Sequence, residues 1–424
     1  VLSILEDNKV LSGNSNAPII YKTYADRAAL SFAQERLWFI EKYEEGTNAY
    51  HMPFAMTLKK GIDINGLRYA LQKIVSRHEV LRTTIFIDED FKTIQKIHKH
   101  PLPIEETKLS LDSNINQVVK NDFDRPFDLT REFPIRVKLF KTKNKTILSI
   151  NIHHIASDGW SMEIFKEELF AYYSSFINNN QTFNLPDLEI QYKDYAIWQR
   201  SFLSGKLLEK QISYWREKLN GYETLILPTD YSRTKMVDYV GAKEIYHMDR
   251  EISNNLRELA KISKTTLHSI FLAATNIFLG KYSGQNDIVT GSVNANRHHR
   301  QTRHNIGFFV NTQVNRCLLL KNQSYNELVL QIHKDQIELQ SYQDLPFELL
   351  VDELGVKRDT SRHPIFQVMF FVLGNFSEQK KAKKTTHSLF KSPENEVSYE
   401  IEKFDISIII DDSNEEIVLH FGYT

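Results

Sequence analysis

Residues 146–173 read TILSINIHHIASDGWSMEIFKEELFAYY, and the order of elements in this stretch decides the fold. Apolar and polar residues alternate up to His154, which predicts a strand with His153 on the opposite face. Asp158-Gly159 predicts a turn after the strand. Apolar residues then recur from Ile164 to Tyr173 with a period close to 3.6, which predicts an amphipathic helix. A strand therefore delivers two histidines to a turn just before a helix begins.

His154 is the candidate reactive residue, because the ends of strands and the loops after them often carry reacting groups. A hydrogen-bonded core histidine would fit the same pattern, so the pattern leaves both interpretations open. Asp158 has a structural interpretation as well, since an Asp before a helix accepts backbone N–H bonds. We expect no metal site among His153, His154 and Asp158, because zinc ligands converge whereas adjacent strand residues diverge.

The segment HHIASDG at 153–159 resembles the HHxxxDG motif of the acyltransferase superfamily that includes chloramphenicol acetyltransferase and condensation domains. Six further stretches resemble motifs of condensation domains of nonribosomal peptide synthetases and occur in the family's order. They are LSFAQERLWF at 30–39, RHEVLRTTI at 77–85, YKDYAIWQR at 192–200, IGFFVNTQVNR at 306–316, YQDLPFELLVDEL at 342–354 and RDTSRHPIFQVMFF at 358–371. The chain is therefore identified as a member of that family.

The resemblance implies an α/β fold, an α+β sandwich built from two chloramphenicol-acetyltransferase-like lobes in a V-shaped pseudodimer with a central tunnel. The Asn-rich stretch with Leu-Pro at 178–190 predicts the linker between lobes at 1–177 and 191–424. Members of the family continue into another helix pair, so we expect the second lobe to be truncated at its C-terminal end.

The activity implied is amide bond formation between a donor aminoacyl or peptidyl thioester and the amine of an acceptor aminoacyl thioester. Both substrates would be carried on phosphopantetheine arms of carrier-protein domains, with an adenylation domain adjacent and no cofactor held by the chain itself. A coenzyme A-dependent acyltransferase and a catalytically silent module that recruits partners are the alternatives. The DGWS and SRHPIFQ variants favour a donor ending in a D-residue.

The resemblance also implies roles for single residues. His154 would act as a general base or position the acceptor amine, and His153 would be structural. Asp158 would form a buried ion pair that fixes the loop, with Arg297 as the preferred partner and Arg82 as the second choice. We expect Gly159 to permit a backbone shape or a close approach that a Cβ would obstruct. Trp160 would pack under the loop.

One arginine and one histidine of the second motif, Arg82 and His78, each have an expected structural role. Arg82 follows a helix and enters a strand, so its guanidinium needs a carboxylate or carbonyl groups around it. His78 lies at the C-terminus of the helix predicted from residue 64, where a charged imidazole interacts favourably with the helix dipole.

Composition bounds the remaining possibilities. The chain has 424 residues, enough for two domains of about 200 residues each. Its 53 basic and 54 acidic residues give a formal charge of -1, which offers no electrostatic footprint for nucleic acid or an anionic membrane. Its apolar runs are too short to cross a bilayer. The single cysteine, Cys317, excludes an internal disulfide and is typical of a reducing compartment, so we expect a cytoplasmic protein.

Overall fold

The computed structural model describes residues 19–43, 48–110, 113–180, 182–235, 237–356, 359, 361–373 and 401–424. Helices and strands alternate along these ranges, which confirms the predicted α/β class. The described helices are α2 (Phe32–Tyr43), α3 (Ile64–Arg77), α4 (Ile115–Asp124), α5 (Gly159–Ile177), α6 (Tyr192–Phe202), α7 (Gly205–Lys218), α8 (Arg250–Ile262), α9 (Leu267–Ser283), α10 (Tyr325–Leu339) and α11 (Phe347–Glu353).

The strands belong to three sheets. The described strands are β1 (Arg27–Ala29), β2 (His51–Thr57), β3 (Thr83–Ile87), β4 (Thr93–Ile97), β5 (Ile104–Lys108), β6 (Ile135–Lys141), β7 (Thr146–His153), β8 (Ala242–His247), β9 (Asp287–Asn294), β10 (Asn311–Leu318), β11 (Val368–Leu373), β12 (Ile406–Asp411) and β13 (Val418–Tyr423). β1, β4 and β3 form a small antiparallel sheet in that order.

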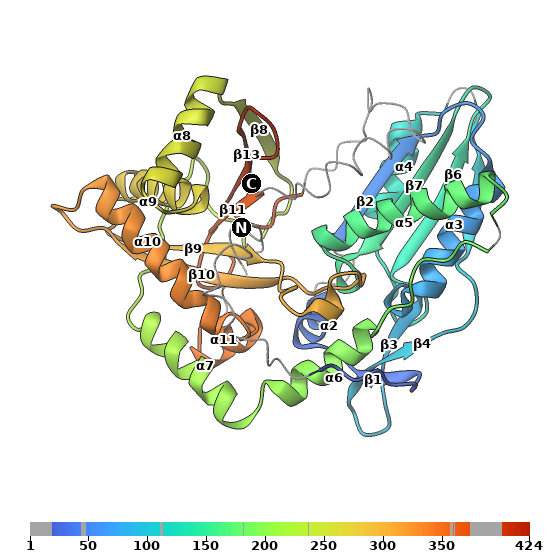
Figure 1. Cartoon of the computed structure of the whole chain (residues 1–424), viewed down its shortest axis with the longest axis horizontal. Coiled ribbons are helices and arrows are strands. Elements are labelled where there is room, and N and C mark those ends of the chain that lie inside the picture. Colours follow the sequence, from blue (N-terminus) through green and yellow to red (C-terminus); the bar gives the residue numbers. More distant parts are fainter. Residues whose placement is uncertain are drawn as a thin grey trace.

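The histidine strand β7 lies inside a four-stranded sheet with the order β2-β7-β6-β5. β7 pairs antiparallel with β2 and β6, and β5 runs parallel to β6. Helices α3 and α5 pack together on one face of the sheet against Leu148, Ile150 and Ile152 (Figure 1). Helix α4 covers the other face at Ile147. The strand is therefore buried on both faces, and its polar residues need partners inside the protein.

The six-stranded sheet has the order β10-β9-β11-β12-β13-β8. β9, β11 and β12 run parallel, and β10, β13 and β8 pair antiparallel with their neighbours. Apolar residues of α8, α9 and α10 cover one face, and those of α7 and α11 cover the other. α8 and α9 are consecutive helices, and β12 and β13 form an antiparallel hairpin. Cys317 is buried on β10, and burial raises the pKa of its thiol to about 12.

One core contains residues from both sides of the predicted linker. α5 ends at Ile177 and α6 begins at Tyr192. Tyr192, Tyr195, Ile306 and Phe309 all belong to the core that α3, α5 and β7 form. The second half of the chain thus packs into the first half beside the end of the histidine strand.

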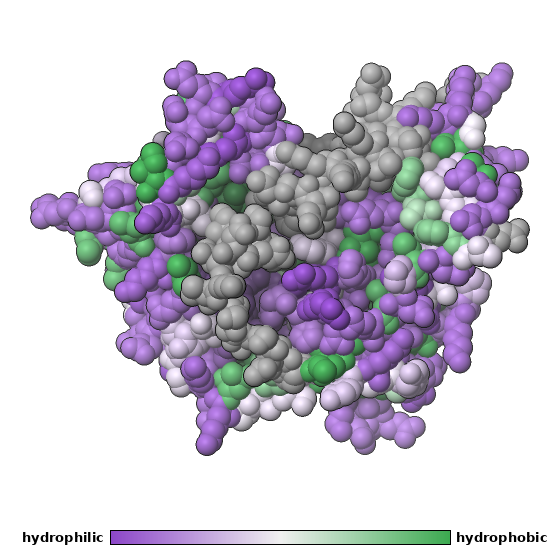
Figure 2. Space-filling model, viewed as in Figure 1, coloured by the Kyte–Doolittle hydropathy of each residue, from purple (hydrophilic) through white to green (hydrophobic). Residues whose placement is uncertain are grey.

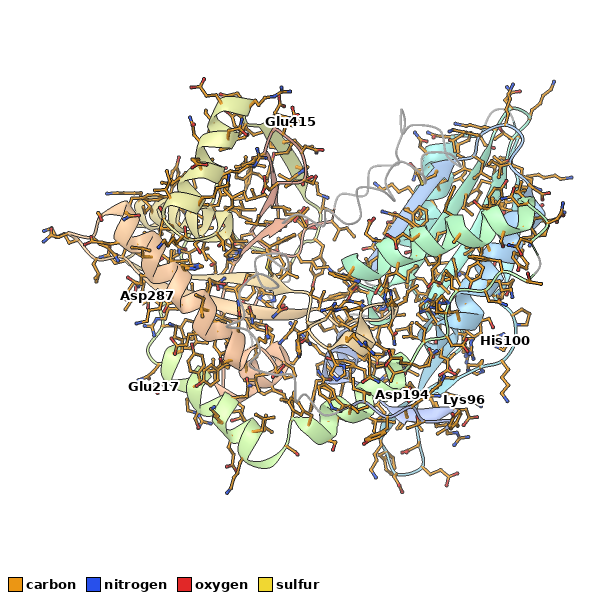
Figure 3. All side chains as sticks on the ribbon, in the orientation of Figure 1. Lys96, His100, Asp194, Glu217, Asp287 and Glu415 are labelled. Carbon is orange, nitrogen blue, oxygen red and sulfur yellow. The ribbon has the colours of Figure 1, made fainter. Side chains whose placement is uncertain are left out.

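Carboxylates fix two elements of this framework, and Figure 3 labels both of them. Asp194 in the first turn of α6 accepts hydrogen bonds from the backbone N–H groups of Thr23 and Gln191, each at 2.8 Å. Asp287 at the start of β9 pairs with Arg316 on β10 at 2.8 Å. The contact of Asp194 with Thr23 and that of Asp287 with Arg316 join segments that are 171 and 29 residues apart in sequence.

The face of the molecule shown in Figure 2 is mostly hydrophilic, with apolar residues scattered over it. Within the ranges that the structure covers, every helix is too short or too polar to pass through a bilayer.

Candidate active site

His154 begins a short 3₁₀ turn, His154–Ala156, instead of ending the strand. β7 stops at His153, whose side chain accepts a hydrogen bond from the backbone N–H of Ile155 at 3.0 Å and so caps the turn. The backbone N–H of His154 donates to the carbonyl of Tyr50 at 2.8 Å. The prediction that His154 lies in the strand is therefore wrong by one residue, because its neighbour's imidazole redirects the chain.

The ring of His154 is half-buried and has few contacts. Its Nδ1 is buried without a hydrogen-bond partner among the described residues. Phe308 approaches the ring edge to face, with the centroids 5.0 Å apart. Burial, and secondarily the positive charge of Lys403, lowers the pKa of His154 well below its ordinary value of 6.5. The imidazole is therefore neutral at pH 7 and retains a lone pair that can accept a proton.

His153 is locked on the other side of the strand, as the sequence predicts. Its side chain is fully buried, and its Nε2 lies 3.3 Å from Oε2 of Glu41. Because Nδ1 accepts the bond from Ile155, the proton is on Nε2 and is donated to the Glu41 carboxylate. Burial lowers the pKa of His153. Both ring nitrogens are occupied, which leaves His153 a structural residue.

The ion pair expected between Asp158 and Arg297 is present, and it is fully buried. Nη2 of Arg297 lies 3.0 Å from Oδ1 and 3.3 Å from Oδ2 of Asp158. The same carboxylate caps α5 by accepting the backbone N–H of Ser161 at 2.8 Å. It also accepts the backbone N–H of Phe309 at 3.0 Å. Asp158 thus joins the start of α5 to the loop before β10.

Two neighbours complete this buried network. The hydroxyl of Ser161 donates to Asp158 at 2.7 Å and accepts from Arg297 at 2.8 Å and from the backbone N–H of Gly307 at 3.1 Å. Arg297 itself donates to the carbonyls of Thr302 and Asn305, both at 2.7 Å. The network provides partners for a carboxylate and for the two Nη groups of a guanidinium, and each of these groups would be costly to bury alone.

Arg82 lies elsewhere and is not a partner of Asp158. It belongs to a 3₁₀ turn, Glu79–Arg82, and donates to the carbonyls of Val75 at 3.1 Å and His98 at 2.6 Å. Glu79 is 3.6 Å away. The expectation of carbonyl and carboxylate partners is confirmed, whereas the second-choice pairing with Asp158 is wrong.

The expectation for Gly159 is also wrong. A Cβ at Gly159 would meet open space, and its backbone does not have a positive φ. The close approach occurs at Gly307, where a Cβ would collide with the rings of Tyr192 and Phe309. Trp160 next to Gly159 donates from Nε1 to the carbonyl of Arg303 at 3.0 Å, and the guanidinium of Arg297 lies 5.7 Å from its ring. Trp160 therefore packs between the helix start and the loop of the second half.

His78 differs from its expected role at a helix end. Its Nε2 lies 3.0 Å from Oε2 of Glu168, and its Nδ1 accepts the backbone N–H of Ile306 at 3.2 Å. This pattern requires a neutral ring with the proton on Nε2. Burial lowers the pKa of His78 accordingly. The imidazole joins α5 to the second half and does not act as a charged cap.

Phe308 and Lys403 contact or influence His154 although the sequence did not single them out. Phe308 lies inside the IGFFVNT motif, which could have signalled a position near the site. Lys403 is in a segment, EKFDIS, that has no local signal. A small pocket is lined by Phe308 together with residues of α2, α6 and the start of β10. Phe308 thus contacts the His154 ring and also lines this pocket.

The comparisons with known proteins agree on one family. The condensation-domain profile matches residues 24–424. One of the linear gramicidin synthase proteins of Brevibacillus parabrevis is 37% identical over 421 residues, which are 97% of this chain and 8% of that protein. The chain spans about a tenth or less of the length of this curated relative and of others that it matches.

Solved structures share the fold. The X-domain from teicoplanin biosynthesis has a TM-score of 0.82 and 24% identity, with 96% of this chain and 92% of that one covered. A four-domain nonribosomal peptide synthetase bound to AMP and glycine has a TM-score of 0.77 and 21% identity, with 97% of this chain and 32% of that one covered.

Proposed function

The chain belongs to the condensation-domain family, and from this membership we propose that it joins a donor acyl thioester to the amine of an acceptor aminoacyl thioester. The observation that carries the proposal is the imidazole of His154. It is neutral, has an unpartnered nitrogen among the described residues, and follows directly from a rigid strand. A group of this kind is suited to accept one proton or to orient an amine.

The reaction needs no covalent intermediate with the protein. The acceptor nitrogen attacks the thioester carbonyl carbon, the carbon–sulfur bond breaks, and the sulfur leaves as a thiolate. Nδ1 of His154 is buried without a partner among the described residues, so we propose that Nε2 is the nitrogen that faces the substrates. We assign Nε2 to the attacking amine, whose proton it accepts or whose lone pair it directs toward the carbonyl.

The demand on the base is modest. The α-ammonium group of a thioester is more acidic than an ordinary ammonium, so a weakly basic imidazole can remove its proton. Holding two reactants together supplies a large effective concentration in addition. The network of Asp158, Ser161 and Arg297 supports both roles, because it fixes the loop after His154 from two sides.

The partners that we propose follow from the relatives. The similar proteins are much longer than this chain, and one solved relative is a four-domain synthetase bound to AMP and glycine. We propose that carrier domains bring donor and acceptor on phosphopantetheine arms, and that an adenylation domain is a neighbour. We further propose lobes at 1–177 and 191–424 joined by 178–190, with the two arms meeting in a tunnel at His154.

The test is condensation with defined partners. The 424-residue chain is mixed with phosphopantetheinylated donor and acceptor carrier domains loaded with L- or D-aminoacyl groups, and the dipeptidyl carrier is measured by mass spectrometry. We expect product with the wild-type chain and a loss of at least about 100-fold with His154→Ala, the range typical of a lost general base. Full activity of His154→Ala would refute the role of His154.

The same assay separates the alternatives. Transfer from an acyl-coenzyme A donor but not from carriers would indicate the coenzyme A-dependent enzyme. Binding of loaded carriers without any product would indicate a silent recruiting module. A higher rate with D-ended donors would support the preference that the DGWS segment suggests.

A further inference from the structure

Lys403 lies beside the candidate site and comes from the opposite half of the chain. It precedes β12, and its Nζ is 4.4 Å from the centre of the Tyr50 ring. Tyr50 precedes β2, and its carbonyl accepts the backbone N–H of His154 at 2.8 Å. Lys403 is close enough to both His153 and His154 to lower the pKa of each. The ammonium is thus a near neighbour of the proposed base.

The ammonium of Lys403 has no carboxylate partner within the described ranges. The adjacent Glu402 is occupied by the hydroxyl of Ser407 at 2.8 Å, and Lys243 lies 3.8 Å from the same side chain. Arg36 is the other cation nearby, and it is committed to Glu348 at 2.9 Å. Lys403 is half-buried among these groups, and burial lowers its pKa to about 8.

A half-buried ammonium that makes no ion pair with a described carboxylate is costly to hold in the free protein, and a negative group of the substrate would offset that cost. The charge on the phosphate of a phosphopantetheine arm is many bonds away from the thioester, so it cannot lie beside His154 when the thioester does. The negative charges that arise at the thioester itself are the oxyanion of the tetrahedral intermediate and the thiolate that leaves.

We infer that the ammonium of Lys403 binds the oxyanion that forms on the donor carbonyl, which makes Lys403 a second catalytic residue. This inference rests on the proposed function. The acceptor nitrogen forms the new bond to the carbonyl carbon, and the π electron pair moves onto oxygen beside Lys403. The pair returns as the carbon–sulfur bond breaks and sulfur takes that bond's electrons. The amine proton passes to His154 and then to the thiolate.

The assignment gives each half of the chain one task. His154, from the first half, handles the proton, and Lys403, from the second half, stabilises the charge on oxygen. A preorganised charge at a developing oxyanion is among the strongest contributions that a protein makes to acyl transfer.

The first test compares Lys403→Met with Lys403→Arg in single-turnover condensation by the 424-residue chain with loaded carriers. Met keeps a side chain of similar length without the charge, whereas Arg keeps the charge. We expect Lys403→Met to slow the step by about 100-fold, as loss of one oxyanion donor does, and Lys403→Arg to retain most of the rate. Lys243→Met is the matched control, because Lys243 is an exposed cation near the same Glu402, and it should be unchanged.

The second test is the pH dependence of the rate. The charged and titratable groups facing Lys403 are Arg36, Glu402, His153, His154 and Tyr50. The ammonium is lost as the pH rises through the pKa of about 8, so the wild-type rate should fall there. Arginine stays charged, so Lys403→Arg should not show this fall.

These outcomes decide the inference separately from the proposed function. A wild-type chain without condensation activity would refute the proposed function. An active wild-type chain with an equally fast Lys403→Met variant would refute only the role of Lys403. Equal loss in Lys403→Met and Lys403→Arg, with a lower melting temperature for both, would assign Lys403 to structure and also overturn the inference.

Discussion

Nη2 of Arg297 lies 3.0 Å from Oδ1 of Asp158 across a sequence separation of 139 residues, and both side chains are buried. Asp158→Ala would leave the guanidinium without its counter-charge. We expect a loss of about 3–5 kcal/mol in the free energy of unfolding, the range for breaking a buried ion pair. Chemical denaturation measures it.

The double variant Asp158→Ala/Arg297→Met provides the control for this pair. Because it removes both charges, its loss should be clearly smaller than the sum of the two single losses. Additive losses would contradict a direct coupling between the two side chains.

The adjacent histidines should respond differently to substitution. His153→Ala removes the bond to Glu41 and the cap of the 3₁₀ turn, so it should lower the free energy of unfolding by about 2–4 kcal/mol and reduce condensation. His154→Ala should abolish most condensation while changing stability by less than about 1 kcal/mol. Paired denaturation and turnover measurements distinguish them, and a large loss of stability in His154→Ala would argue for a structural role.

Two glycines near the site should respond differently to substitution by alanine. Gly159→Ala places its Cβ in open space at a helix start, so stability should be unchanged or slightly higher. Gly307→Ala forces a Cβ into the rings of Tyr192 and Phe309, so the melting temperature should fall by several degrees. Thermal unfolding of both variants is the measurement. Equal melting temperatures would contradict the packing at Gly307.

The acid side of the rate profile should reflect the lowered pKa of His154. Because the folded protein disfavours the charged ring, the neutral form persists below pH 6.5, and the rate should begin to fall only at lower pH. Removing the nearby positive charge in Lys403→Met should raise the pKa of His154 and shift this fall to higher pH. Profiles of kcat/KM for wild type, Lys403→Met and Lys243→Met test this, and an unshifted profile in Lys403→Met would contradict the electrostatic coupling.

Acid should destabilise the second half of the chain through His268. Burial lowers its pKa to about 4, and its Nε2 has no hydrogen-bond partner among the described residues. The unfolded chain binds this proton near pH 6.5 and the folded chain near pH 4. Stability is therefore lost as the pH falls through this window, by up to about 3 kcal/mol.

The measurement is the slope of unfolding free energy against pH between 6.5 and 4. His268→Gln should flatten the slope, because glutamine does not titrate. His247→Gln, at an exposed position of β8, is the control and should keep the wild-type slope. An identical slope in His268→Gln would exclude His268 as the source.

The strand and the helix around the site were predictable, because the spacing of apolar residues within each segment determines both elements. The alternation before His153 and the 3.6-residue period after Asp158 are properties of neighbouring residues, and β7 and α5 follow from them. The partner of Asp158 came from the family resemblance, since nothing near Arg297 in the sequence distinguishes it from the other basic residues of its loop.

Features that depend on tertiary contacts were not predictable. Whether a glycine allows a close approach depends on what packs against it, which is why Gly307 and not Gly159 needs a bare backbone. The 3₁₀ turn at His154 depends on a side-chain cap from His153. Lys403 lies near the site because β12, which follows it, pairs with β11 and β13 in the six-stranded sheet. The residues next to Lys403 in the sequence do not predict this pairing.

The bond from Gly307 to the hydroxyl of Ser161 has a practical consequence for engineering. Together with the ion pair of Asp158 and Arg297, this bond means that residues before 178 and residues after 295 both form the surroundings of His154. A hybrid enzyme whose first half comes from one parent protein and whose second half comes from another, joined at 178–190, takes Asp158 and Ser161 from the first parent and Arg297 and Gly307 from the second. Such hybrids should be active only when both parents carry the same residues at these four positions, which are therefore the positions to match when parent proteins are chosen.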